Sequence, residues 1–89
     1  MAEKEAKKEA KKEFKYEIIR NFEVLSTNTR TGWNREINLV SWNDAKPKLD
    51  IRDWAPDHSK MGKGISLTYE EASILRESLQ EIDLDNLND

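Results

Sequence analysis

The stretch KLDIRDWAPDHSKMGKGISLT, from Lys48 to Thr68, decides the fold of this chain. It predicts a strand over 48–54, a charged loop over 55–64, a short strand over 65–67 and the cap of a helix. Side chains of the first strand alternate between two faces, because strands have a period of two. Leu49 and Ile51 share one face and are predicted to reach a core. The opposite, polar face carries Lys48, Asp50, Arg52 and Trp54.

Arg52 and Trp54 are the first pair that suggests a function. Residues i and i+2 on one face of a strand lie about 7 Å apart. That spacing suits a flat ring stacked on the indole and a negative group held by the guanidinium, and a nucleotide has both parts. The alternative is an exposed tryptophan half covered by the arginine stem in a cation–π contact.

Two more strands precede this stretch. Residues 14–25 keep apolar side chains largely on one parity, which predicts a long strand, although Ile19 and Leu25 break the pattern and indicate a bend. The polar segment STNTRTG at 26–32 predicts a turn. Residues 33–42 alternate again, with Ile37 and Leu39 predicted for the core and Trp42 on the polar face.

The segment NDAKP at 43–47 predicts a tight turn, so the strands before and after it are expected to form an antiparallel hairpin. If their polar faces coincide, four side chains project from one surface: Trp42, Lys48, Arg52 and Trp54.

A helix begins after Thr68, where Thr68 as N-cap and Glu71 as the third helical residue predict a capping box. Its apolar residues form a narrow stripe of Ala72, Leu75, Leu79 and Ile82. This stripe has three alternative partners: its own sheet, a second copy of the chain, or both.

The predicted fold class is α+β, with a four-stranded curved antiparallel β-sheet followed by one C-terminal α-helix (β-β-β-β-α) that covers one face. The domain prediction is a charged, flexible or partly helical tail at 1–13, a folded domain at 14–83 and a frayed C-terminus at 84–89. A core this small is marginal, which favours oligomerisation.

The chain has a net charge of −3, and this charge is unevenly distributed. Residues 69–89 hold seven acidic side chains and one basic, whereas residues 14–68 hold nine basic and seven acidic. A mildly basic sheet can therefore bind a polyanion although the whole chain is acidic. The chain contains no cysteine and has no apolar run long enough for a signal peptide or a membrane span, so we expect a cytoplasmic protein with no membrane partner.

Binding of single-stranded nucleic acid requires aromatic rings for the bases and cations along the backbone. Trp42 and Trp54 are the candidates for stacking, with packing at the hairpin end as the alternative for Trp42. The candidates for phosphate contacts are Lys48, Arg52, Lys60 and Lys63, with Lys46 and Arg35 in second rank. Ordinary solubilising charge is the alternative for each lysine. Gly62 and Gly64 would let the backbone approach phosphates.

No enzyme is predicted. His58 is the single histidine, and no second histidine, cysteine or spaced carboxylate cluster accompanies it, so it is interpreted as a plain loop residue. No metal, cofactor or catalytic residue is expected.

The run D-I-R-D-W followed by K-M-G-K-G-I-S-L-T-x-E-E resembles the positive cofactor four family of transcriptional coactivators, and most closely its bacterial YdbC-like branch. The likeness extends from about Phe14 to about Leu79. It implies a homodimer whose helix and sheet form the interface, at Leu75, Leu79 and Ile82, and whose sheets bind single-stranded DNA with little sequence preference. By this resemblance Trp42 takes the stacking position, with Arg52, Trp54 and Lys63 at the neighbouring contact positions.

This sequence departs from the animal members of that family at two positions of the sheet. Val40 stands where they carry a base, and Ala55 where they carry a second aromatic residue. The first hypothesis is accordingly a dimeric single-stranded DNA binder in transcription regulation, replication or repair, associated with the nucleoid and with transcription or repair proteins as further partners. The alternatives are a protein–protein adaptor that uses the same aromatic face, and an RNA-binding protein.

Overall fold

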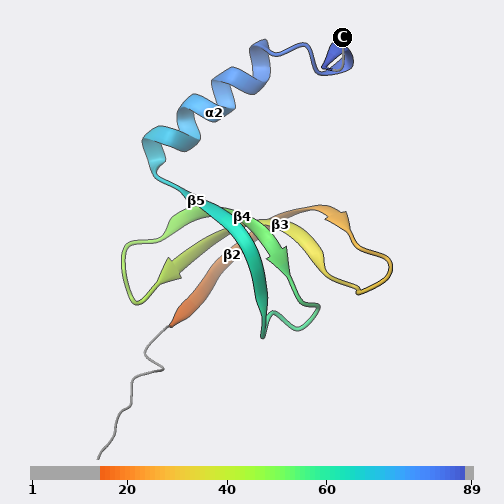
Figure 1. The fold of residues 1–89 in the computed structure, drawn as a ribbon. Coiled ribbons are helices and arrows are strands. Elements are labelled where there is room, and N and C mark those ends of the chain that lie inside the picture. Colours follow the sequence, from red (N-terminus) through yellow and green to blue (C-terminus); the bar gives the residue numbers. More distant parts are fainter. Residues whose placement is uncertain (1–14, 88–89) are drawn as a thin grey trace, which may run out of the picture.

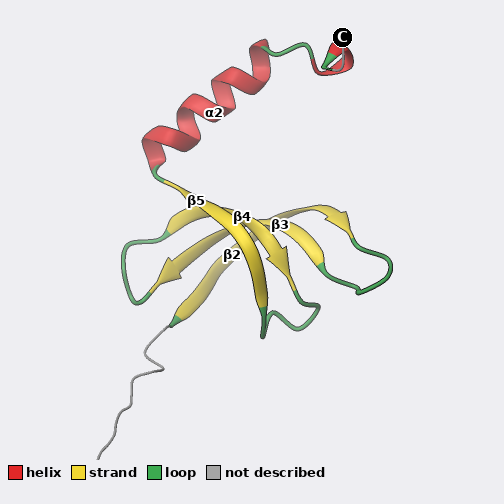
Figure 2. Cartoon of the chain, viewed as in Figure 1, coloured by secondary structure: helices red, strands yellow, loops and turns green. Residues whose placement is uncertain are grey.

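The computed structural model describes residues 15–87, which form one sheet followed by one helix (Figure 1). The elements are β2 (Tyr16–Thr27), β3 (Asn34–Trp42), β4 (Lys48–Trp54), β5 (Met61–Leu67), α2 (Tyr69–Glu81) and a 3-10 turn at Leu84–Asn86 (Figure 2). The sheet has the order β2-β3-β4-β5, and each neighbouring pair is antiparallel. The predicted β-β-β-β-α order is confirmed, whereas the predicted tail at 1–13 lies outside the described residues.

The fourth strand is longer than predicted, because β5 begins at Met61 rather than at Ile65. Gly64 pairs with Arg52, and a register shift between Arg52 and Trp54 lets Met61 pair with Trp54. The glycines therefore belong to a strand with a local irregularity and not to the loop that their composition suggested.

Two faces of the sheet follow from the register of β3 and β4, where Asn38 lies opposite Asp50 and Leu39 opposite Leu49. Residues directly opposite each other point to the same side. We call the side that carries Glu36, Asn38, Val40, Trp42, Asp50, Arg52 and Trp54 the inner face. The outer face carries Arg35, Ile37, Leu39, Leu49, Ile51 and Asp53.

Five of the six buried residues among 15–87 lie on the inner face, in contrast to the sequence-based prediction, and the sixth is Ala55, just after β4. Val40, Trp54, Asn38 and Asp50 are 0% exposed and Glu36 is 2% exposed. The apolar pairs predicted to form the core, Ile37–Ile51 and Leu39–Leu49, are only half-buried within one chain. The reason is curvature: Figure 1 shows a strongly bent sheet. Side chains on the inner side of such a bend lie closer together than those on its outer side, in agreement with the burial of the inner face.

Strand β2 contributes to this curvature through three irregularities. Its register against β3 shifts between Ile18 and Arg20, again between Asn21 and Glu23, and again between Val24 and Ser26. Each shift leaves one additional residue on β2, and such bulges bend a strand and increase its twist. The extra residues are Ile19, Phe22 and Leu25, and this insertion is why Ile19 and Leu25 break the alternation of the sequence.

The turn between β3 and β4 and the start of α2 agree with the sequence. Asn43 and Asp44 both have positive φ, 52° and 64°, and Ala45 N donates to Trp42 O at 2.9 Å. These are the features of a type I′ turn, for which asparagine and aspartate are favoured. At the helix, Thr68 and Glu71 form the predicted capping box.

Helix α2 projects away from the sheet instead of covering a face of it (Figure 1). None of its residues is buried, and the side chains of its stripe are exposed at 36% for Leu75, 47% for Leu79 and 44% for Ile82. Only its start lines a groove with the outer face, formed by Tyr69 and Ala72 together with side chains such as Leu49. Among residues 15–87 no helix is long and apolar enough to cross a membrane.

Candidate nucleic-acid interface

The centre of the inner face is an ion pair between Arg52 and the buried Asp50, two residues apart on β4. Arg52 Nε donates to Asp50 Oδ1 at 2.6 Å, and Nη2 donates to Oδ2 at 2.8 Å. The side chains are 15% and 0% exposed. A buried carboxylate is tolerated only when charged or polar groups form hydrogen bonds with it. The bidentate ion pair with Arg52 provides these hydrogen bonds and also fixes the plane of the guanidinium.

Trp42 packs on the same guanidinium. Arg52 Cζ lies 4.7 Å from the centre of the Trp42 ring, within the range of a cation–π contact. The indole Nε1 donates to Ser66 Oγ at 3.0 Å, and Ser66 Oγ donates to Asp50 Oδ2 at 2.7 Å. Trp42, Ser66, Asp50 and Arg52 therefore form a closed cycle of contacts, which we call the Trp42 platform.

Gly64 makes room for this platform. A Cβ placed on Gly64 would overlap Cβ of Arg52 and crowd the carbonyl oxygen of Ile51. The glycine of the K-G-I-S-L motif is thus required for β5 to lie close to β4 at the position of Arg52. From the sequence, Gly64 is expected to let the backbone approach a phosphate. In the structure it instead allows β5 to lie close to β4.

A second polar network occupies the inner face around Glu36. His58 Nε2 lies 3.0 and 3.1 Å from the two carboxylate oxygens of Glu36. Asn21 and Asn38 each donate to Glu36 Oε1, at 3.0 and 3.1 Å, and Asn21 also donates to Asn38 at 2.6 Å. His58 lies in the β4–β5 loop, as predicted, but its ring also contacts the buried carboxylate of Glu36 on the inner face, which the sequence did not indicate.

Trp54 belongs to an aromatic cluster beside that network. Its ring lies 5.3 Å from Tyr16 and 5.6 Å from His58, and the Tyr16 hydroxyl donates to the carbonyl oxygen of His58 at 2.6 Å. The residue is 0% exposed, and its Nε1 has no hydrogen-bond partner among the described residues. A ring buried in this way packs the fold, and it presents no surface on which a base could stack.

The predicted cations lie in several places. Lys48 follows the inner-face parity at the exposed start of β4, opposite Val40. Lys46, Lys60 and Lys63 are exposed in the β3–β4 turn, the β4–β5 loop and β5. Since the inner face itself holds the acidic Glu36 and Asp50 against one arginine, positive charge lies at its margins and not at its centre.

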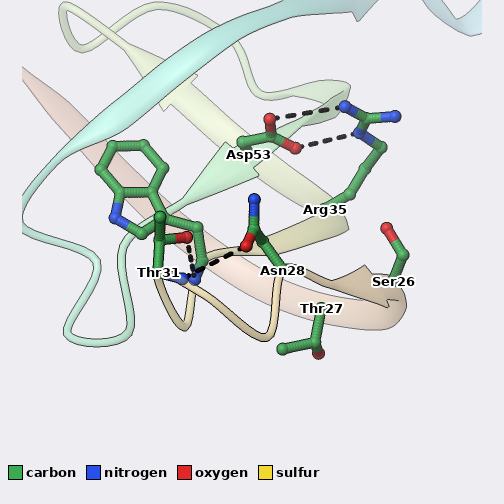
Figure 3. Close-up of a pocket in the computed structure, with 7 residues that line it drawn as sticks. Ser26, Thr27, Asn28, Thr31, Arg35 and Asp53 are labelled. Carbon is green, nitrogen blue, oxygen red and sulfur yellow. Dashed lines mark hydrogen bonds and ion pairs between the residues drawn. The ribbon is translucent and has the colours of Figure 1, made fainter.

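Arg35 lies on the outer face, away from the other predicted binding residues. Its Nε donates to Asp53 Oδ1 at 2.9 Å, and this hydrogen bond together with the charge of Asp53 raises the pKa of Arg35. The pair borders a polar hollow of about 370 Å³ beside the β2–β3 hairpin (Figure 3). The hollow is lined by Ser26, Thr27, Asn28, Thr31, Trp33, Arg35 and Asp53.

Trp42, Lys48, Arg52 and Trp54 lie on one face, as their parity in the sequence predicts. Asp50, Ser66 and Glu36 are parts of the site that the sequence pattern does not predict. The sequence does contain a signal for Asp50. Aspartate is uncommon in strand interiors, and Asp50 lies on the same face of the predicted strand as Arg52. Ser66 and Glu36 carried no such signal, since their roles depend on which residues lie opposite them.

Comparison with known proteins identifies relatives of this chain. The family model described as Transcriptional Coactivator p15 (PC4) matches residues 29–78, which include β3, β4, β5 and most of α2. An uncharacterized protein of Treponema pallidum (strain Nichols) is 49% identical over 70 residues, which are 79% of this chain and 81% of that protein.

Proposed function

Because the chain belongs to the transcriptional coactivator p15 (PC4) family, we propose that it binds single-stranded DNA without sequence preference, as a homodimer and not as an enzyme. Membership of the family confirms the resemblance drawn from D-I-R-D-W and K-G-I-S-L, while assignment to the YdbC-like branch stays a prediction. A role in transcription regulation, replication or repair, and a cytoplasmic, nucleoid-associated location, belong to this proposal.

The Trp42 platform is the observation that carries the proposal. It combines a partly exposed indole with a guanidinium 4.7 Å from its ring centre, and both side chains are held by a buried acid. Stacking of a base on an aromatic side chain contributes about 1–3 kcal/mol and tolerates any base, because every base has a π-face. The phosphate contacts in this proposal come from exposed lysines: Lys48 at the start of β4, and Lys46, Lys60 and Lys63 in the neighbouring turn, loop and strand.

The proposed homodimer is supported by the apolar surface that one chain leaves uncovered. The stripe of α2 is about 40% exposed, and Phe22 on the outer side is 45% exposed. Large apolar surfaces of this kind mark sites of association. A second copy that packs against the outer face and the stripe of Leu75, Leu79 and Ile82 would bury both.

The proposal is tested with a thymidine oligomer of about 20 bases, titrated at several salt concentrations against the wild type and the Trp42→Ala variant. We expect binding that weakens with salt, with a log–log slope of about −0.7 per phosphate contact. Trp42→Ala is expected to weaken binding by about 5- to 150-fold, the equivalent of about 1–3 kcal/mol, with the salt slope unchanged.

Trp33→Ala is the matched control, because Trp33 borders the hollow beside the hairpin and takes no part in the platform. Equal affinities of the wild type and Trp42→Ala would refute the stacking role. A duplex that competes as well as the oligomer would refute the preference for single strands. A ribo-oligomer of the same sequence distinguishes DNA from RNA, since the strands differ chiefly in the 2′-hydroxyl.

A protein–protein adaptor is the second candidate, and specific observations favour it. Tyr69 is 80% exposed and Ile74 is 65% exposed, both outside the stripe of α2, on a segment with a strong excess of acids. This function predicts an oligonucleotide affinity that does not exceed that of an unrelated acidic protein, with no change on Trp42→Ala. The titration above therefore separates the two candidates.

A further inference from the structure

All three nitrogens of the Arg52 guanidinium already have partners within the described chain. Nε and Nη2 donate to the two oxygens of Asp50, and Nη1 lies 3.4 Å from the carbonyl oxygen of Gly62 and 3.9 Å from Sδ of Met61. The charge of Arg52 is also compensated by a carboxylate that is 0% exposed. A guanidinium held in this way is poorly disposed to become the main contact of a phosphate.

Asp50 holds more than the arginine. Its Oδ2 accepts one hydrogen bond from Arg52 and a second from Ser66, and Ser66 in turn accepts the indole Nε1 of Trp42. One buried carboxylate on β4 thus sets the positions of a side chain on its own strand, one on β5 and one on β3. Both layers of the stacked pair, the indole and the guanidinium, depend on this single group.

We propose that Asp50 and Ser66 are positioning residues: they fix Arg52 beneath Trp42 as the lower layer of a rigid stacking platform and withhold its charge from the phosphates. This inference rests on the proposed function and assigns to Arg52 a part in base stacking, while the phosphate contacts fall to the marginal lysines. A platform whose side chains are already ordered in the free protein loses less conformational entropy when single-stranded DNA binds, and this favours affinity.

The first experiment examines the free protein, so that its result does not depend on DNA. Ser66→Ala removes the link between Trp42 and Asp50, and Ser26→Ala is a control at a strand serine outside the platform. We expect the Trp42 indole N–H to exchange with solvent at least tenfold faster in Ser66→Ala, measured by NMR, and at the wild-type rate in Ser26→Ala. An unchanged exchange rate in folded Ser66→Ala would overturn the positioning role.

The second experiment examines the charge of Arg52 through the salt dependence of oligonucleotide binding. Asp50→Asn removes the compensating charge, and Asp53→Asn makes the same change of net charge three residues away on the outer face. We expect the slope to steepen by about 0.7 in Asp50→Asn, as one additional phosphate contact would cause. The slope of Asp53→Asn should stay at the wild-type value.

Equal slopes in the two asparagine variants would overturn the inference, because a general charge effect would then explain them. If Asp50→Asn does not fold, the exchange rate in Ser66→Ala decides the positioning role, and the salt slope of an Arg52→Ala variant, which should equal that of the wild type if the charge is withheld, decides the second part. If the wild type binds no oligonucleotide, the proposed function fails and the withheld charge has no role in it, whereas the indole exchange rate still decides whether Asp50 and Ser66 position Trp42.

Discussion

The inner and outer faces of the sheet differ in burial, and the face that carries the larger share of polar side chains in β3 and β4 is the buried one, with Val40 and Trp54 packed among them. Glu36, Asn38 and Asp50 are at most 2% exposed, while the outer-face residues Ile37 and Leu49 remain half-exposed. The comparison teaches that the apolar content of a face does not decide its burial within one chain. In a strongly bent sheet the direction of bending decides which face is buried. The polar groups on the inner side must then form hydrogen bonds and ion pairs with one another.

The two faces therefore serve different purposes. Buried polar groups that are fully hydrogen-bonded specify a unique arrangement of side chains, and this is the property that a preformed binding surface requires. Exposed apolar residues such as Phe22 and Leu79 lower the free energy of the protein only once something covers them. One chain buries its inner face with its own side chains, whereas apolar side chains of the outer face stay exposed, as the proposed dimer requires.

Removal of the buried indole of Trp54 should have the largest effect on the inner face. Trp54→Ala deletes a ring that is 0% exposed, and such deletions lower the free energy of unfolding by about 3–5 kcal/mol. Chemical denaturation checks this value. Ile51→Ala on the half-buried outer face, measured at a concentration where the chain is monomeric, should have a smaller effect. A loss below about 1 kcal/mol in Trp54→Ala would contradict the burial of this ring.

A charge in the stripe of α2 should break the proposed dimer. Leu79→Glu places two like charges across the interface, which costs several kcal/mol, so we expect the dimer dissociation constant to rise by about two orders of magnitude or more. Sedimentation at several concentrations measures it. Ile74→Glu makes the same change about 120° around the helix from the stripe and should leave the dimer intact. Identical behaviour of both variants would argue against the stripe as the interface.

Two glycines of β5 provide a matched comparison of the faces. Gly64→Ala forces a methyl group against Arg52 on the inner face and should destabilise the protein by about 1–3 kcal/mol, as overpacking typically does. Gly62→Ala meets Cβ of Asp53 at 3.4 Å on the outer side and should change stability by less than about 0.5 kcal/mol. Thermal and denaturant unfolding measure both. Equal effects would show that the strands can separate at Gly64.

The smallest effect is expected at Asp57, an exposed acid of the β4–β5 loop that contrasts with the buried acids of the inner face. Hydrogen bonds from the Ser59 hydroxyl and backbone N–H, at 2.7 and 3.0 Å, lower the pKa of Asp57. The folded state thereby gains stability that is present above the unfolded-state pKa and is lost as pH falls through the folded-state pKa. Ser59→Ala should raise the pKa of Asp57 towards its ordinary value, as NMR titration of the carboxyl carbon would show.

Local signals in the sequence predicted the elements of the fold well. The alternation in 48–54, the Asn43–Asp44 turn and the Thr68–Glu71 capping box each depend on residues close together in the chain, and each is confirmed. Such features follow from the backbone preferences of a few neighbouring residues. The order β-β-β-β-α follows from them.

The burial of the faces could not be predicted in the same way. It depends on the curvature of the whole sheet. Ile19 and Leu25 indicated a bend in β2, but the three register shifts and the direction of the bending are defined only once the partner strand is known. The site shows the same division. Parity placed Trp42 and Arg52 on one surface, but the burial of Trp54 and the cycle through Asp50 and Ser66 depend on residues brought together from different strands.

Strand β2 lies at an edge of the sheet, where an unpaired backbone can attract the strand of another molecule. At 12 residues it is the longest strand here, and the exposed Ile19 and Leu25 give it the composition of an aggregation-prone segment. The three additional residues interrupt the regular spacing of its free N–H and C=O groups, so an incoming strand finds no continuous ladder to extend. The irregularity that bends the sheet therefore also keeps this edge from recruiting further chains.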